Sequence, residues 1–492
     1  MRGLAKQYLD RLSRRDFLIG DALVDGRWLS GEQRAAVFDP ATGEEIAHVA
    51  CCELQEVDRA IAAAERDFPA WRKLLPAERG NILRAWAGKM REHSEDLAVL
   101  MTCEQGKPLA ESRYEIEYAA GFLDWFAAEG ERAYGETIPS HKRSSLLHTR
   151  AQPVGIAAII TPWNFPSAMI TRKAAAALAA GCPVIVKPAP ETPLSGLALG
   201  RLGQEVGLPA GIFQVLTGHA AKLSNRLLED TRVRALSFTG STAVGRLLLG
   251  KAAESVKKVS LELGGHAPFL LFEDAPLDLA VRGAMAAKFA TSGQDCLAAN
   301  RIYVQRPIYD RFINAFADAI QSLRVGHGLE PGTDIGPMTR LSVAEKCHSH
   351  IQDALARGAR LITGGADSRL GERFVTPTLL ADVTDDMAIA TEETFGPVAA
   401  VLPFDSEDEV LRRANANEMG LAAYLYTNDL RRGLRISDSL ECGMVGVNTA
   451  SFTGPPIPFG GWKQSGLGRE GSRHGMSEYI ELKYVCFGDL AA

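Results

Sequence analysis

The chain has 492 residues, of which 54 are basic and 60 acidic, so its formal net charge is −6. Apolar residues make up 46% and charged residues 23%, an ordinary globular composition that supports a sizeable core. The mildly acidic balance argues against non-specific nucleic-acid binding. No stretch approaches the roughly 18 uninterrupted apolar residues of a membrane span. We therefore expect neither a nucleic-acid nor a membrane partner.

The cysteine content indicates a reducing compartment. Eight cysteines are too sparse for a disulfide scaffold, and none forms a CxxC pair. We expect a cytoplasmic protein without a metal site, and we interpret His348 and His350 as solvated helix histidines. Arg14 and Arg15 imitate a twin-arginine export signal, but charged residues follow where such a signal needs an apolar segment.

The first half of the chain predicts a short N-terminal helix, charged helices at 54–66, 76–93 and 94–105, and then alternating strands and helices. The strands are expected at 155–160, 183–187, 212–216, 235–238 and 259–263. The helices between them are expected at 167–180, 194–206, 221–228 and 243–254. Continuous apolar strands that alternate with helices indicate a parallel sheet covered on both faces. A ligand should bind outside the carboxyl ends of these strands.

The second half repeats this pattern after Asp274. Helices are expected at 277–290, 308–323 and 343–357, with strands at 301–304 and near Leu361, Val398 and Ala422. Two polar, alternating segments predict exposed strands that need a partner edge, which suggests oligomerisation. The predicted fold is α/β, with two doubly wound parallel-sheet domains and a small β oligomerisation arm. The expected division is a dinucleotide-binding domain (1–136 and 153–264), a catalytic domain (265–460) and the arm (137–152 and 478–490).

A glycine-containing turn marks one candidate cofactor site. Gly240, Ser241 and Gly245 follow a strand and open a helix, whose N-terminus could attract a pyrophosphate. The spacing is not GxGxxG, and the next two residues, Arg246 and Leu247, lack the lysine and hydroxyl of a P-loop. Alone, the turn could equally be a plain connection between a strand and a helix.

Lys187 ends a neighbouring strand, from which its side chain could reach ribose hydroxyls. The alternative is a surface lysine. Glu191, without an arginine or serine beside it, mildly disfavours a bound 2′-phosphate. Two such turns in one parallel sheet favour a dinucleotide.

Three residues carry candidate chemistry. Cys296 lies in a glycine-flanked loop between a helix and a strand, where a thiolate could act as nucleophile or the cysteine could be buried and inert. Glu262 lies inside an apolar strand, and a carboxyl with a pKa raised by burial is a plausible general base. Asn164 follows the first strand and could donate to an oxyanion, or simply cap a turn. Cys182 and Cys486 are interpreted as core residues.

These motifs resemble the aldehyde dehydrogenase superfamily in type and in order. The resemblance extends from about Gly26 to Phe487. It rests on Trp163-Asn-Phe-Pro166, Lys187-Pro-Ala189, Phe238-Thr-Gly-Ser241, Leu261-Glu-Leu-Gly-Gly265, Gly293-Gln294 with Cys296, Glu393-Thr-Phe-Gly-Pro397 and Pro458-Phe-Gly-Gly461.

The resemblance implies NAD-dependent oxidation of an aldehyde, with NADP as an alternative. Cys296 would form a thiohemiacetal and then a thioester, Asn164 would hold the oxyanion, and Glu262 would activate water. A base at this position favours hydrolysis over transfer to coenzyme A. Residues implied to bind the cofactor are Thr161, Pro162, Trp163, Lys187, Glu191, Gly240, Ser241, Gly245, Glu393 and Phe395. Members of this superfamily are homodimers or homotetramers.

Within the superfamily the chain is most similar to succinate-semialdehyde dehydrogenases. Arg172 and Thr453 correspond to residues that hold the substrate carboxylate, whereas Ala290 replaces a second arginine. The aldehyde is therefore expected to be small and anionic. Glutarate semialdehyde, sulfolactaldehyde and an aromatic semialdehyde remain alternatives, as does a catalytically silent homologue. Asp295 would raise the pKa of the Cys296 thiol unless it points away.

Overall fold

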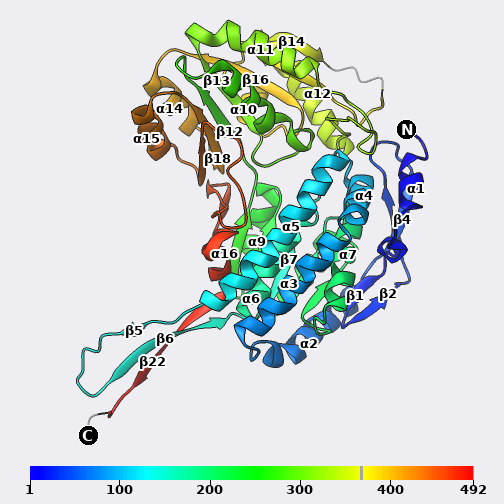
Figure 1. Ribbon diagram of the computed structural model, residues 1–492, viewed down its shortest axis with the longest axis vertical. Helices are drawn as coiled ribbons and strands as arrows, with labels where there is room; N and C mark the ends of the chain where they lie inside the picture. The colour runs from blue at the N-terminus through cyan, green and yellow to red at the C-terminus, as the bar shows by residue number, and fades with distance from the viewer. Residues whose placement is uncertain (366–369, 491–492) are drawn as a thin grey trace.

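A computed structural model describes residues 1–365 and 370–490. The chain forms two lobes, and a narrow three-stranded arm projects from the first lobe (Figure 1). No helix in these two ranges is long and apolar enough to cross a membrane.

The first lobe is built on an eight-stranded sheet of order β2-β1-β9-β8-β7-β10-β11-β21. Five central strands are parallel, whereas β1, β2 and β21 run antiparallel at the two edges. The strands are β1 (Ala22–Val24), β2 (Arg27–Leu29), β7 (Ile156–Ile160), β8 (Val184–Lys187), β9 (Phe213–Val215), β10 (Val233–Thr239), β11 (Lys258–Glu262) and β21 (Gly466–Leu467).

Helices cover both faces of this sheet because its strands are apolar on both sides. Ala157 and Ile159 of β7 face one core, and Ile156 and Ala158 face another. The first face carries α6 (Ala168–Ala180) and α7 (Pro193–Glu205), overlaid by α3 (Pro76–Glu92), α4 (Ser94–Gln105) and α5 (Leu109–Glu129). The second face carries α2 (Leu54–Trp71), α8 (Ala220–Glu229) and α9 (Thr242–Ala253).

The second lobe contains a seven-stranded sheet of order β14-β15-β16-β13-β12-β18-β19, parallel except for the edge strand β14. Its strands are β12 (Ala267–Leu271), β13 (Ala299–Gln305), β14 (Arg360–Gly365), β15 (Thr376–Ala381), β16 (Val398–Phe404), β18 (Ala422–Tyr426) and β19 (Met444–Val447). One face packs on α10 (Leu277–Phe289) and α11 (Tyr309–Gln321). The other packs on α12 (Leu341–Ala356), α14 (Glu407–Asn415) and α15 (Leu430–Ser439).

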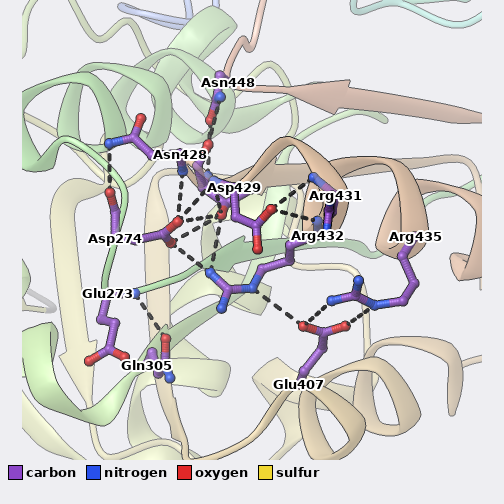
Figure 2. A network of polar contacts seen from close by, with 11 residues as sticks. Glu273, Asp274, Gln305, Glu407, Asn428, Asp429, Arg431, Arg432, Arg435 and Asn448 are labelled. Atoms are coloured by element: carbon purple, nitrogen blue, oxygen red, sulfur yellow. Dashed lines mark hydrogen bonds and ion pairs between the residues drawn. The ribbon is translucent and has the colours of Figure 1, made fainter.

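A polar network fastens α14 and α15 to the end of β12 (Figure 2). Asp274 accepts hydrogen bonds from the backbone N–H groups of Asn428 and Asp429, both at 3.0 Å, and pairs with Arg432 at 2.8 Å. Arg432 and Arg435 both contact Glu407 of α14. Because one carboxylate satisfies several donors at the start of α15, this helix has a fixed position at the rim of the lobe.

The arm consists of β5 (Thr137–Ile138), β6 (Leu146–Pro153) and β22 (Ile480–Phe487), with β6 in the middle. β22 pairs antiparallel with all eight residues of β6 and runs out along the arm (Figure 1). The remaining elements are α1 (Leu4–Leu9), η1 (Arg15–Leu18), β3 (Arg34–Phe38), β4 (Glu45–Ala50), η2 (Gly130–Arg132), η3 (Ala290–Gly293), η4 (Arg306–Ile308), α13 (Ala388–Thr391), β17 (Met419–Gly420), β20 (Trp462–Lys463) and α16 (Ser472–Ser477).

The predicted fold class is confirmed, with antiparallel edge strands as an addition. The sequence did not predict α5, β12, β15 or β19. The interpretation of Cys486 as a core residue is wrong, because this cysteine is exposed on β22, whose sheet projects away from both lobes. The segment around Arg14 and Arg15, which resembles a twin-arginine export signal, is folded. Arg14 pairs with Asp16 at 2.8 Å and with Glu205 at 2.5 Å.

Candidate active site

A cavity of about 820 Å³ opens along the carboxyl ends of β7, β8 and β10 and reaches across to the second lobe. This is within the usual range for small-molecule sites. The cavity ends at Cys296. The predicted site residues that line it are Thr161, Pro162, Trp163, Asn164, Lys187, Gly240, Ser241, Cys296, Glu393 and Phe395. Most residues predicted for the cofactor are thus gathered around one space.

The first-lobe side of the cavity offers groups suited to a dinucleotide. Ser241 caps α9, and its hydroxyl accepts the Val244 N–H at 3.4 Å. The free N–H groups of this helix N-terminus can hold a pyrophosphate. Lys187 is 1% exposed and donates to the Pro188 carbonyl. Burial lowers the pKa of Lys187 to about 8.

Two predicted cofactor residues do not line the cavity. A side chain at Gly245 would place its Cβ 2.4 Å from Leu263, so this glycine lets α9 approach β11. Glu191 instead pairs with Arg340 at 2.7 Å. Arg340 belongs to the second lobe and does line the cavity. The Glu191–Arg340 pair therefore joins the two lobes at the entrance.

The second-lobe wall is formed around Glu393 and Phe395. Glu393 accepts the Gly265 N–H at 3.0 Å, and burial raises the pKa of its carboxyl to about 7. Phe395 has a left-handed backbone with φ 59° and meets Trp163 edge-on, with ring centroids 5.5 Å apart. A conformation that is strained for an aromatic residue persists because the surrounding structure enforces it, as is common at functional sites.

The loop before Cys296 contains three consecutive left-handed residues, Thr291, Ser292 and Gly293, with φ between 51° and 73°. Polar contacts hold this strained loop: Glu111 accepts the Thr291 N–H at 2.8 Å, and the Ser292 hydroxyl accepts the Gly336 N–H at 2.8 Å. The Gly293 Cβ position lies 2.4 Å from Gly396, so only glycine fits there.

Asn164 lies next to this loop. It is 3% exposed, and its Nδ2 donates to the Gln294 carbonyl at 3.1 Å. An amide nitrogen carries two hydrogens, so one N–H stays available beside the thiol. Asn164 is thus placed as an oxyanion donor would be.

Cys296 is partly exposed at the end of the loop. Burial raises the pKa of its thiol well above the usual value, Asp295 raises it further, and Arg172 lowers it. Asp295 accepts the Leu297 N–H at 2.9 Å. Its carboxyl lies close enough to the nucleophile to disfavour the thiolate.

Glu262 lies at the end of β11 within a buried charged cluster. It is 2% exposed, and neither of its carboxylate oxygens has a hydrogen-bond partner among the described residues. Burial and the nearby Glu470 raise the pKa of Glu262 well above normal, against the opposing effects of Arg172 and Lys173. A carboxyl with this environment suits a general base near neutral pH.

The same cluster contains residues that the sequence did not single out. Glu470 pairs with Arg172 at 2.5 Å and with Lys173. Burial opposes ionisation of Glu470, but these two cations outweigh it and lower the pKa of the carboxyl. Lys173 directly follows Arg172 in the sequence, yet no local pattern revealed that both meet Glu470.

Arg172 and the predicted substrate residue Thr453 both lie near Tyr118 of α5, since both affect the pKa of its phenol. The Arg172 guanidinium lies 4.1 Å from the centre of the Phe459 ring. A guanidinium, a phenol and a hydroxyl together can bind a carboxylate. Tyr118 was missed because α5 itself was missed.

His266, Trp462 and His350 are not at this centre. His266 lines an adjoining cavity of about 580 Å³, and burial lowers its pKa to about 3. Trp462 is 48% exposed. The interpretation of His350 as solvated is wrong: it is 3% exposed and contacts the Thr394 hydroxyl at 3.1 Å, because that face of α12 packs on the second lobe.

These residues fit a nicotinamide dinucleotide. The cavity is long, mostly apolar and continuous from Lys187 and the α9 N-terminus to Cys296. A cofactor bound along it would bring its reactive end beside the thiol, as oxidation of a thiol-bound aldehyde requires.

Known proteins support this arrangement. The non-phosphorylating aspartate-semialdehyde dehydrogenase of Halomonas elongata is 53% identical to this protein, over 96% of this chain and 96% of its own length. The 3-sulfolactaldehyde dehydrogenase of Pseudomonas putida is 52% identical over 95% of the chain and 96% of its own length. The crystal structure of succinate-semialdehyde dehydrogenase from Burkholderia pseudomallei superposes with a TM-score of 0.96 at 47% identity, covering 97% of this chain and all (100%) of that one. The profile of the aldehyde dehydrogenase family matches residues 28–485. The chain therefore belongs to the aldehyde dehydrogenase family and is an aldehyde-oxidising oxidoreductase, as the sequence predicted.

Proposed function

We propose that this enzyme oxidises a small anionic aldehyde that resembles succinate semialdehyde to the carboxylate, using Cys296 as nucleophile. The observation that carries the proposal is that Cys296 lines the cofactor cavity and also lies near Arg172, which has Tyr118 and Thr453 beside it. An aldehyde whose carboxylate binds this cluster would present its carbonyl carbon to the thiol. The named substrates of the relatives, which are aspartate semialdehyde, sulfolactaldehyde and succinate semialdehyde, are all small aldehydes with an acidic group.

The chemistry follows from the residues present. The Cys296 thiolate attacks the carbonyl carbon, and Asn164 Nδ2 and the Cys296 N–H hold the resulting oxyanion. A nicotinamide cofactor held by Lys187, Glu393 and Phe395 would supply the acceptor for the hydride that this carbon loses, and the product on Cys296 would then be a thioester. Glu262 then takes a proton from the attacking water, and the thioester is hydrolysed to the carboxylate with return of the thiol.

We propose NAD as the preferred coenzyme, with NADP as an alternative. Lys187 and Glu393 would hold ribose hydroxyls, and Thr161, Pro162, Trp163, Gly240, Ser241 and Phe395 would line the rest of the site. The ion pair between Glu191 and Arg340 uses the cation that could otherwise hold a 2′-phosphate, which supports NAD. Steady-state kinetics with both coenzymes would decide between them.

We further propose that residues 1–136 and 153–264 bind the cofactor, that 265–460 supply the catalytic loop, and that 137–152 with 478–490 join subunits into a homodimer or homotetramer. Exposed apolar side chains on β22 support the last point, since Leu482 is 70% and Tyr484 55% exposed. The cytoplasm is the proposed compartment because all eight cysteines are free thiols.

Replacing Cys296 tests the proposed function. Cys296→Ala should abolish NADH formation from succinate semialdehyde, because no other group can form the thioester, while NAD still binds with near-normal affinity. Absorbance at the NADH band and calorimetric titration with NAD measure the two properties. Turnover that persists in the variant would contradict the proposal.

A further inference from the structure

We propose that the pocket takes an aldehyde that carries an ammonium group as well as a carboxylate, with Asp295 as the ammonium acceptor and Arg172 holding the carboxylate. This inference rests on the proposed function and specifies its substrate class. Asp295 would then be a specificity-determining residue.

Asp295 is partly exposed beside Cys296. Residues 291–294 and 298–304 are buried, whereas 295–297 are partly exposed. Cys296 lines the cofactor cavity, but Asp295 does not. We therefore assign the open side of Asp295 to the bound aldehyde and not to the cofactor.

Asp295 has no ion-pair partner in residues 1–365 and 370–490, in contrast to Arg172, which already pairs with Glu470 at 2.5 Å. Glu111, another acid, also acts on Asp295, while the nearest compensating cations are Lys107 and Arg172. Lys107 is itself paired with Glu115 at 2.7 Å. Both cations that act on Asp295 are thus already paired with another carboxylate.

An unpaired carboxylate in this place is costly in two ways. Its desolvation is unfavourable, and its charge disfavours the thiolate that the reaction needs. A substrate that brings its own cation reduces both costs, because the ammonium satisfies Asp295 and offsets its charge beside the sulfur. A purely anionic substrate would instead be repelled by Asp295.

The alternative role for Asp295 is to accept the Leu297 N–H at 2.9 Å and so shape the loop. Asparagine would keep this hydrogen bond through its amide oxygen while removing the charge. Asp295→Asn therefore separates the two roles.

The short distance between the carbonyl carbon on Sγ and the Asp295 carboxylate limits where the substrate can carry its amine. The carbonyl carbon bonds to Sγ, so a group that contacts the carboxylate beside Sγ must lie within about two carbons of the carbonyl. Aspartate semialdehyde has an ammonium at this distance and a terminal carboxylate. Succinate semialdehyde has the same four-carbon chain and carboxylate without the amine, so the two form a matched pair of probes.

The decisive experiment compares kcat/KM for the two probes in the wild type and in Asp295→Asn. We expect the wild type to prefer aspartate semialdehyde, and the variant to lower the ratio of kcat/KM for aspartate semialdehyde to that for succinate semialdehyde by about 10- to 100-fold, the value of one charge-assisted hydrogen bond. Asp295→Asn also changes the pKa of the Cys296 thiol, but this change affects kcat/KM for both probes alike and therefore cancels in the ratio. Asp278→Asn, which removes the same charge from an exposed position at the start of α10, should leave the ratio unchanged.

Product inhibition provides a test that needs no variant. Aspartate should inhibit the wild-type enzyme, competitively with the aldehyde, at least about 10-fold more strongly than succinate. A ratio unchanged in Asp295→Asn, or equal inhibition by the two acids, would overturn the role of Asp295 while leaving the proposed function intact. Failure of the wild type to oxidise either semialdehyde would instead contradict the proposed function itself.

Discussion

At the residue scale, the Cys296 thiol lies between opposing charges. Burial and Asp295 raise its pKa, and Arg172 lowers it. The thiol must ionise to attack, so the enzyme should gain activity as the pH rises toward the thiol pKa. Burial also raises the pKa of Glu262, the proposed base for hydrolysis. Both groups therefore reach the ionised form that the reaction needs as the pH rises.

The pH profile of Asp295→Asn follows from these charges. A negative neighbour disfavours the thiolate, so removing it lowers the thiol pKa. The acidic limb of kcat/KM for succinate semialdehyde should therefore move to lower pH than in the wild type. A limb that stays in place or moves to higher pH would show that Asp295 does not control ionisation of the thiol, and Asp278→Asn provides the control.

Residues that belong to contiguous motifs were predictable, because each motif lies at the end of one strand or in one loop and brings its own geometry. Asn164, Lys187 and Ser241 are of this kind, and all three line the cavity. Tyr118 and Glu470 could not be found in this way. Both contact Arg172, but they come from α5 and from a segment nearly 300 positions beyond Arg172 in the sequence, and only the folded chain brings them together.

At the element scale, the strands and helices of the first lobe were largely predictable because its central strands are short, apolar and bounded by turns. Helix α5 was not, because it packs against α3, α4 and α6 and therefore lacks a clear polar face. Its buried Ser112 and Glu115 further obscure the apolar periodicity. β12 and β15 each contain a proline, and β19 has only four residues, so their strand patterns are weak.

The missed helix matters for function. α5 supplies Tyr118 to the proposed carboxylate site, Glu111 to the strained loop, and Glu115, which pairs with Lys107. One helix thus supports both the substrate side and the nucleophile loop. An arrangement of this kind places functional side chains more precisely than a mobile loop would.

At the scale of the whole molecule, the arm should determine assembly. Leu482 and Tyr484 are exposed on β22, and an edge strand with exposed apolar side chains needs a covering partner. The double variant Leu482→Asp/Tyr484→Asp should therefore shift the protein to a smaller assembly in sedimentation velocity experiments. Leu434 on α15 of the second lobe is 65% exposed, and Leu434→Asp offers a control that should leave the assembly unchanged. An unaltered sedimentation coefficient in the arm variant would show that these side chains do not join subunits.

The two-lobe arrangement places the cofactor cavity in contact with both lobes, and Cys296 from the second lobe lines it. Glu262, at the end of β11 in the first lobe, lies near enough to act on the pKa of the Cys296 thiol. We propose that covalent catalysis takes place at this junction. Glu262→Gln should still form the thioester but hydrolyse it slowly, because glutamine cannot take a proton from water.

The most direct test is intact-protein and peptide mass spectrometry of Glu262→Gln after mixing with NAD and succinate semialdehyde. We expect the mass of one acyl group per subunit, located on the peptide that contains Cys296, together with a burst of about one NADH per active site. An unmodified protein, or a label on another residue, would contradict the account.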